Sequence, residues 1–169
     1  MSSPKWPEVL GPDAERALLE AVTAVAEQSF FAVVEPCDTR QFAQLERDAA
    51  RWLVAAIPFT DADCRGELRC TVSEDLAVAL FDAFTGREPL GPPRAEELLD
   101  LLGEFANMAC GSWLTHRPRR TGFTLGPPSV KWMTDASRPS LTLPHLLLAI
   151  NDLPLVLDVR ATPAVTVPV

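Results

Sequence analysis

A carboxylate and a carboxamide stand three residues apart in one predicted helix, as Glu104 and Asn107. Residues three or four apart share a helix face, and a helical wheel places Asp100, Glu104, Asn107 and Gly111 within roughly 40–60° of one another. The opposite side carries an apolar stripe suited to a core, namely Leu98, Leu102, Phe105, Ala109 and Trp113. The polar face would therefore offer a negative charge beside an amide that both donates and accepts hydrogen bonds.

Glycine and asparagine are unexpected in the middle of this helix. Gly103 and Gly111 each cost about 1 kcal/mol of helix propensity relative to alanine, and the Asn107 amide competes for backbone hydrogen bonds. Glycine also lets another body approach closely. We therefore predict that Asp100, Gly103 and Gly111 bind a partner around the pair formed by Glu104 and Asn107. On the spacing alone, a solvated acidic face remains the alternative, because E-x-x-N occurs often by chance.

The elements that must position this helix alternate between helical and strand periodicity. Helices are predicted at 13–29, 74–85 and 94–115, and a loop at 38–50 with a short helical turn around 41–50. Strands are expected at 30–34, 52–59, 67–72, 122–133 (broken at 126–128), 141–150 and 153–161, the last two joined by a turn at Asn151-Asp152. This order predicts an α+β fold with helices packed on one face of a mostly antiparallel sheet.

Length and composition favour one domain. The chain has 169 residues, of which 47% are hydrophobic, enough for a single core. We expect an irregular arm at 1–12, one domain at 13–161 and a tail or edge strand at 162–169. No run reaches the ~20 apolar residues that span a bilayer, and the start lacks the pattern of a signal peptide. A cytoplasmic protein without a membrane partner is therefore predicted.

Charge and cysteine usage argue against several other classes. The net charge is −8, which disfavours a nucleic-acid partner because the phosphate backbone would be repelled. The four cysteines form no C-x-x-C pair, so free buried thiols and no metal site are predicted. Asp61 and Asp63 fit a turn better than a metal site. His116 and His145 have no partner in the sequence, and neither is assigned a catalytic role.

Two further groups of residues have plain structural interpretations. The basic cluster after the long helix would place cations at a helix C-terminus, although it could also meet an acidic partner; it consists of Arg117, Arg119 and Arg120. The apolar stripe of the 74–85 helix is assigned to the core; it consists of Leu76, Leu80 and Phe84.

The stretch 97–115, ELLDLLGEFANMACGSWLT, resembles the signature helix of the CheC–CheX–FliY group of chemotaxis phosphatases. In that signature an acidic residue precedes E-x-x-N and a glycine, here Asp100, Glu104, Asn107 and Gly111. The segments ERALLEAVTAVAEQSFFAVVEP, GELRCTVSEDLAVALFDAFTG and GFTLGPPSVKW are also similar to the family, so the resemblance covers about residues 13–133.

The resemblance implies a phosphatase that removes the phosphoryl group from the aspartate of a CheY-like receiver domain of a response regulator. The receiver would bring its own Mg²⁺, and this chain would bind no cofactor. Asn107 would orient the attacking water, and Glu104 would contact the active-site lysine of the receiver. The family also implies a two-layer sandwich, with two long helices on one face of the sheet, and a homodimer.

The sequence departs from the family pattern at two places. A second E-x-x-N, which two-site members carry, is absent because Phe30 follows Glu27 by three residues, and this favours the single-site CheX type. Ser112 and Trp113 follow the signature glycine, where the family often has asparagine and small residues. Trp113 falls on the core side of the wheel, but it would alter receiver choice if it faced the partner. The alternative function is a non-catalytic adaptor that binds a receiver or another signalling partner through the same helix.

Overall fold

A single antiparallel sheet forms the centre of the computed structural model, which describes residues 5–86, 91–116, 122–134 and 138–165. Its strand order is β1-β6-β7-β3-β2-β4, and β5 also pairs with β2. The strands are β1 (Val34–Pro36), β2 (Trp52–Thr60), β3 (Cys64–Ser73), β4 (Thr124–Leu125), β5 (Ser129–Trp132), β6 (His145–Ile150) and β7 (Leu153–Pro163). Every strand pair is antiparallel.

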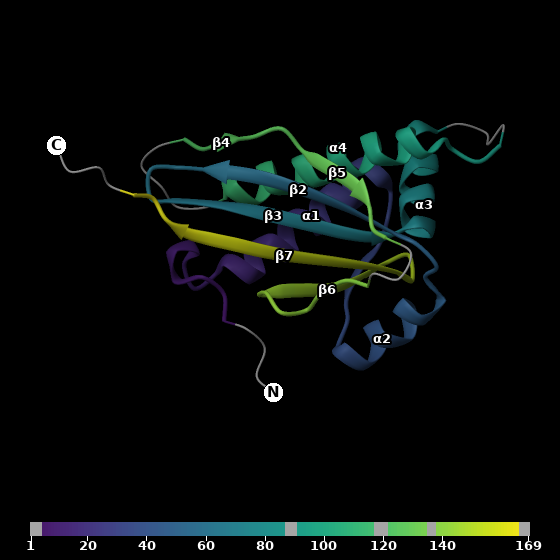
Figure 1. The fold of residues 1–169 in the computed structure, drawn as a ribbon, viewed down its shortest axis with the longest axis horizontal. Coiled ribbons are helices and arrows are strands. Elements are labelled where there is room, and N and C mark those ends of the chain that lie inside the picture. The colour runs from purple at the N-terminus through teal and green to yellow at the C-terminus, as the bar shows by residue number, and fades with distance from the viewer. Residues whose placement is uncertain (1–4, 87–90, 117–121, 135–137, 166–169) are drawn as a thin grey trace.

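Two long helices cover one face of this sheet (Figure 1). They are α1 (Ala14–Phe30) and α4 (Ala95–Thr115), and the shorter α3 (Glu74–Thr85) stands beside them at one end of the sheet. Their apolar faces join the inward side chains of the strands in one core, to which β2 contributes Leu53, Ala55, Ile57 and Phe59. The predicted α+β fold with two long helices on one face is thus confirmed. No helix in the described ranges is long and apolar enough to cross a membrane.

A fourth helix lies on the other face of the sheet. Residues 38–50 were expected to be a loop with a short helical turn around 41–50, and a full helix, α2 (Thr39–Asp48), forms there behind a capping box. Asp38 Oδ1 accepts the Gln41 backbone N–H at 2.7 Å, and Gln41 Oε1 accepts the Asp38 N–H at 2.9 Å. Only Phe42 of this helix is buried, in a small cluster with Trp52, Leu147 and Val156. One buried residue produces no apolar period, which is why the sequence pattern indicated only a short helical turn and not the full helix.

The link between α1 and β1 also differs from the prediction. The strand expected at 30–34 is wrong at all but its last residue, because α1 continues to Phe30 and the strand begins only at Val34. Phe30 is fully buried between Phe84 and Phe105, with ring centroids 5.2 Å away in each case. Phe31 ends the helix in the left-handed conformation at φ 52°. Aromatic packing across helices therefore decided a segment whose local composition favours a strand.

The turn of the last hairpin forms as predicted at Asn151-Asp152, but the strand expected at 141–150 begins only at His145, as β6. Both turn residues have positive φ, 49° and 64°, as a two-residue turn of the primed type requires. Asn151 Oδ1 also accepts the Val33 backbone N–H at 3.0 Å, which ties the turn to the start of β1.

The two ends of the described chain both carry regular structure. Within the predicted irregular arm, Glu8–Leu10 forms the 3₁₀ helix η1, and Leu10 is buried in the core. At the other end β7 runs to Pro163, which pairs with Cys64. Strand pairing therefore extends two residues beyond the predicted limit of the domain.

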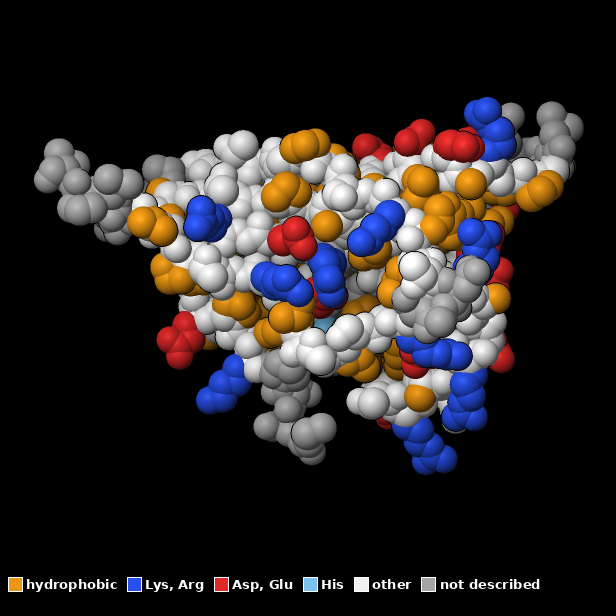
Figure 2. Space-filling model, viewed as in Figure 1, with side chains coloured by type: hydrophobic (Ala, Val, Ile, Leu, Met, Phe, Trp, Pro, Cys, Tyr) orange, Lys and Arg blue, Asp and Glu red, His pale blue; other side chains and the backbone are white. Residues whose placement is uncertain are grey.

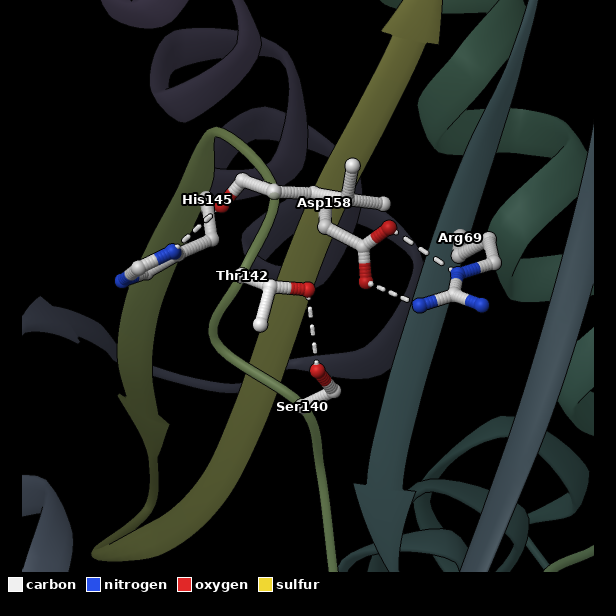
Figure 3. Close-up of polar contacts among 6 residues, drawn as sticks. Arg69, Ser140, Thr142, His145 and Asp158 are labelled. Carbon is white, nitrogen blue, oxygen red and sulfur yellow. Dashed lines mark hydrogen bonds and ion pairs between the residues drawn. The ribbon is translucent and has the colours of Figure 1, made fainter. Parts of the chain in front are cut away.

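An ion pair that no sequence motif indicated crosses the outer face of the sheet. Asp158 on β7 is 2% exposed, and its carboxylate accepts hydrogen bonds from Arg69 Nε at 2.9 Å and Nη2 at 3.2 Å (Figure 3). The two residues are register partners on adjacent strands. The bidentate arrangement compensates a carboxylate that would otherwise be buried without a partner. In Figure 3 the segment that carries Ser140 and Thr142 passes beside it.

Candidate functional site

Helix α4 is anchored at both ends and along its core face. At its start Glu97 Oε2 accepts the Arg94 backbone N–H at 2.8 Å, and the helix ends at Thr115. The predicted apolar stripe is buried throughout; it consists of Leu98, Leu102, Phe105, Ala109 and Trp113. The extent and the orientation of the helix are therefore as predicted, and its polar face is turned away from the sheet.

Trp113 belongs to the core. Its side chain is 0% exposed, and its indole N–H donates to the Ala14 carbonyl at 3.1 Å. Its ring meets Phe59 edge to face, with centroids 5.6 Å apart. The interpretation that placed it on the core side is confirmed, and a partner-facing role is wrong. Trp113 instead joins the end of α4 to the start of α1.

Glu104 and Asn107 line the same hollow on the open side of α4. The hollow has a volume of about 520 Å³, and its wall also includes Leu99, Asp100, Gly103, Pro128 and Val130. Glu104 is exposed and Asn107 is half-buried. Within the described ranges, neither side chain has a hydrogen-bond or ion-pair partner. The amide of Asn107 and the carboxylate of Glu104 are thus both available to a bound molecule.

Of the three residues predicted to bind a partner, the structure brings two into this hollow. Asp100 and Gly103 line it, whereas Gly111 is half-buried one turn beyond Asn107 and is not part of its wall. The far wall, formed by Pro128 and Val130, comes from the β5 region, and sequence reasoning gave it no such role. Its position depends on the pairing of β5 with β2.

Intramolecular packing accounts for Gly103 but not for Gly111, where an added Cβ atom would make only an ordinary van der Waals contact. A Cβ atom on Gly103 would lie 3.2 Å from Val130 Cγ2, and one on Gly111 would lie 3.8 Å from Leu125 Cδ1. Gly103 is also buried. The body that approaches Gly103 is therefore the chain's own strand β5, so the absence of a side chain at this position has a structural explanation without an external partner.

The exposed side of α4 is acidic. Glu96, Asp100 and Glu104 follow one another at four-residue steps and are all exposed. Figure 2 shows acidic side chains gathered along the edge of the molecule formed by α4. The charge of the neighbouring Glu97 is partly neutralised, since Arg94 Nη2 lies 3.6 Å from Glu97 Oε1. A surface of this kind favours a partner with cationic groups.

A second hollow adjoins the first and shares Asp100 and Glu104 with it. It lies between α3 and α4, has a volume of about 270 Å³, and is lined by Phe81, Phe84, Thr85, Glu97, Asp100, Leu101 and Glu104. Phe84 is 49% exposed, whereas Leu76 and Leu80 are buried. The assignment of the stripe to the core is therefore correct for the two leucines and wrong for Phe84. That residue lies near the end of α3, where the helix extends beyond the edge of the core.

The remaining candidates make no site. The Asp61 carboxylate accepts the N–H groups of Asp63 and Cys64 at 2.9 and 2.8 Å, which confirms the turn. His116 Nδ1 lies 2.7 Å from the Ser112 carbonyl, and His145 Nδ1 lies at the same distance from the Leu143 carbonyl. The described ranges hold no group of three or more metal-ligating side chains. The basic cluster Arg117, Arg119 and Arg120 lies outside the described residues.

The thiols are structural. None of the four cysteines forms a disulfide; Cys64, Cys70 and Cys110 are buried, and Cys37 is half-buried. Burial raises the pKa of Cys70 and raises that of Cys110 to about 12. Both thiols therefore stay protonated near neutral pH, which is the wrong state for a nucleophile.

The family model for the chemotaxis phosphatase CheX matches residues 53–141, which is more than half of the chain. No curated protein matches the sequence. Among solved structures, CheX from Vibrio vulnificus is similar with a TM-score of 0.65 and 17% identity, covering 95% of this chain and 100% of that one. The complex of CheX and CheY with BeF₃ and Mg²⁺ from Borrelia burgdorferi matches with a TM-score of 0.59 and 12% identity, covering 88% and 97%. FliY from Thermotoga maritima matches with a TM-score of 0.54 and 17% identity, covering 95% and 92%.

Proposed function

This chain belongs to the CheX family of chemotaxis phosphatases, and on that premise we propose that it hydrolyses the phospho-aspartate of a CheY-like receiver domain. The observation that carries the proposal is the arrangement of Glu104 and Asn107. The two side chains line one hollow on α4, and neither has a partner within the described part of the chain. A similar fold occurs in a CheX that was solved together with CheY.

In the proposed reaction a water molecule attacks the phosphorus atom of the phospho-aspartate. The bond between phosphorus and the aspartate oxygen breaks, and the products are a free carboxylate and inorganic phosphate. Catalysis of this step consists mainly of positioning and charge stabilisation, and a carboxamide that orients the water is an established solution. Asn107 supplies that amide. A carboxylate in its place would bring negative charge to a centre that is already anionic, whereas the amide still donates and accepts.

Glu104 would hold the complex in register by pairing with the active-site lysine of the receiver. The Mg²⁺ ion would come with the receiver, so this chain needs no metal ligands of its own. The acidic face of α4 fits such a partner. Its carboxylates would attract the lysine of the receiver, which offsets their repulsion of the phosphoryl group. We also propose a homodimer, as the family resemblance implies, and a cytoplasmic location, as the sequence predicts; sedimentation of the purified protein tests the dimer.

The test is release of phosphate from a phosphorylated receiver of the same organism, with Mg²⁺, in the presence and absence of this protein. We expect acceleration that Asn107→Ala abolishes and that Glu104→Ala weakens. Glu96→Ala is the matched control for Glu104, because Glu96 lies on the same exposed face of α4 but does not line the hollow. Binding of the receiver without acceleration would refute the phosphatase and favour an adaptor. Acceleration that survives in Asn107→Ala would refute the role of the amide.

A further inference from the structure

We propose that the hollow between α3 and α4, the Phe84 pocket, binds an apolar side chain of the receiver that stands next to a cationic one. The pocket is lined by Phe81, Phe84, Thr85, Glu97, Asp100, Leu101 and Glu104. This inference rests on the proposed function, since it assigns the pocket to the same partner. It goes further by naming a second point of contact, away from the phosphoryl group, and the chemistry of the group that fits it.

The floor of the pocket is aromatic and held in place. Phe84 stacks on Phe30 with ring centroids 5.2 Å apart and planes 26° apart, and Phe30 itself is fully buried. One side of the Phe84 ring is therefore fixed by the core, while 49% of the residue remains exposed. A rigid aromatic surface loses little conformational entropy on binding, which is why such residues act as anchors in interfaces.

The rim of the pocket is negative. Asp100 and Glu104 are exposed and have no ion-pair partner within the described ranges, and Glu97 is half-buried on the same helix. An apolar side chain flanked by lysine or arginine would fit both the floor and the rim of the pocket. The apolar side chain would pack on the Phe84 ring, and the cationic one would pair with a carboxylate of the rim. A second copy of this chain would bring its own acidic α4 to this edge, so charge disfavours a dimer through this face.

Continuity with the first hollow selects the receiver as the occupant. Asp100 and Glu104 line both hollows, so a protein that covers Asn107 has its surface at the mouth of the Phe84 pocket. The pocket contains no part of the chemistry proposed for Asn107. Phe84 is therefore expected to affect the affinity for the receiver and not the chemical step.

The experiment compares Phe84→Ala with the unmodified protein in steady-state dephosphorylation and in binding of a receiver loaded with BeF₃ and Mg²⁺. We expect KM and Kd to rise about tenfold, as for truncation of an interface anchor, while kcat stays within about twofold. Phe84→Leu keeps an apolar floor in the pocket and should retain much of the affinity for the receiver that Phe84→Ala loses. Val165→Ala is the matched control, because Val165 is an exposed apolar residue two positions after β7. The C-terminal end of β7 lies at the opposite end of the sheet from α3 (Figure 1).

The outcomes separate this inference from the proposed function. Unchanged KM and Kd in a folded Phe84→Ala would overturn the pocket and leave the phosphatase standing. A receiver that binds more weakly to Phe84→Ala, but that the unmodified protein does not dephosphorylate, would support the pocket and refute the phosphatase. Absence of receiver binding to the unmodified protein would overturn both. Because Phe84 stacks on Phe30, urea unfolding of the variants establishes that they are folded.

Discussion

Replacing Gly111 by alanine should stabilise the protein. Gly111 lies inside α4, and alanine is favoured over glycine in a helix by about 1 kcal/mol. The added methyl group has room, since the nearest atom outside the helix backbone is Leu125 Cδ1 at 3.8 Å, an ordinary contact distance. No steric cost offsets the gain. We expect the free energy of unfolding to rise by about 1 kcal/mol, which for a chain of this size raises Tm by roughly 2–4 °C.

Gly103→Ala is the matched control for this prediction. The gain in helix propensity is the same, but its Cβ would lie 3.2 Å from Val130 Cγ2 and 3.6 Å from Pro128 Cβ. Strand β5 would have to shift by a few tenths of an ångström, so the stabilisation should be smaller or absent. Urea unfolding followed by circular dichroism measures both variants. A gain at Gly103 equal to that at Gly111, or no gain at Gly111, would refute the packing argument.

The same Gly111→Ala variant also tests whether a partner approaches α4 at this position. If Gly111 binds the receiver, the methyl group would lie in the interface, and dephosphorylation would slow although the protein is more stable. Such an exchange of stability for function is common at binding sites. An increase in Tm with unchanged kcat/KM would show that no partner approaches α4 closely at this position, and it would refute the prediction that Gly111 binds the receiver.

Two further predictions concern the core. Gly66→Ala should cost about 3 kcal/mol or more, because its Cβ would collide with the backbone carbonyl oxygen of Arg160 on the paired strand; Gly122→Ala, with nothing within 4 Å, is the control. A loss at Gly66 no larger than at Gly122 in urea unfolding would contradict this. The second concerns alkaline pH. Burial raises the pKa of Cys110 to about 12, so above about pH 9 the unfolded chain loses this proton first and the free energy of unfolding falls, by at most about 1.4 kcal/mol per pH unit for each such thiol. Cys110→Ala should flatten the fall of the urea midpoint between about pH 9 and pH 11, and an unchanged slope would contradict the burial effect.

Much of the fold was readable because local signals agreed with one another. The apolar stripe and the ends of α4, the alternation in β3 and the Asn151-Asp152 turn were each predicted and are present in the structure. Two elements were misjudged where packing overrode local composition. Helix α2 has one buried residue, Phe42, and hence no period to detect, while Phe30 was drawn into α1 by the aromatic rings around it.

The candidate site divides in the same way. Residues three or four apart on a helix must share a face, so the sequence by itself determined that Asp100, Glu104 and Asn107 would be neighbours. Only the tertiary structure decided what surrounds them. The wall from the β5 region, the use of Gly103 by the chain's own strand, and the exposed ring of Phe84 all depend on contacts between segments that are distant in sequence. A helical period reports which residues are on one side of a helix, but it carries no information about what packs there.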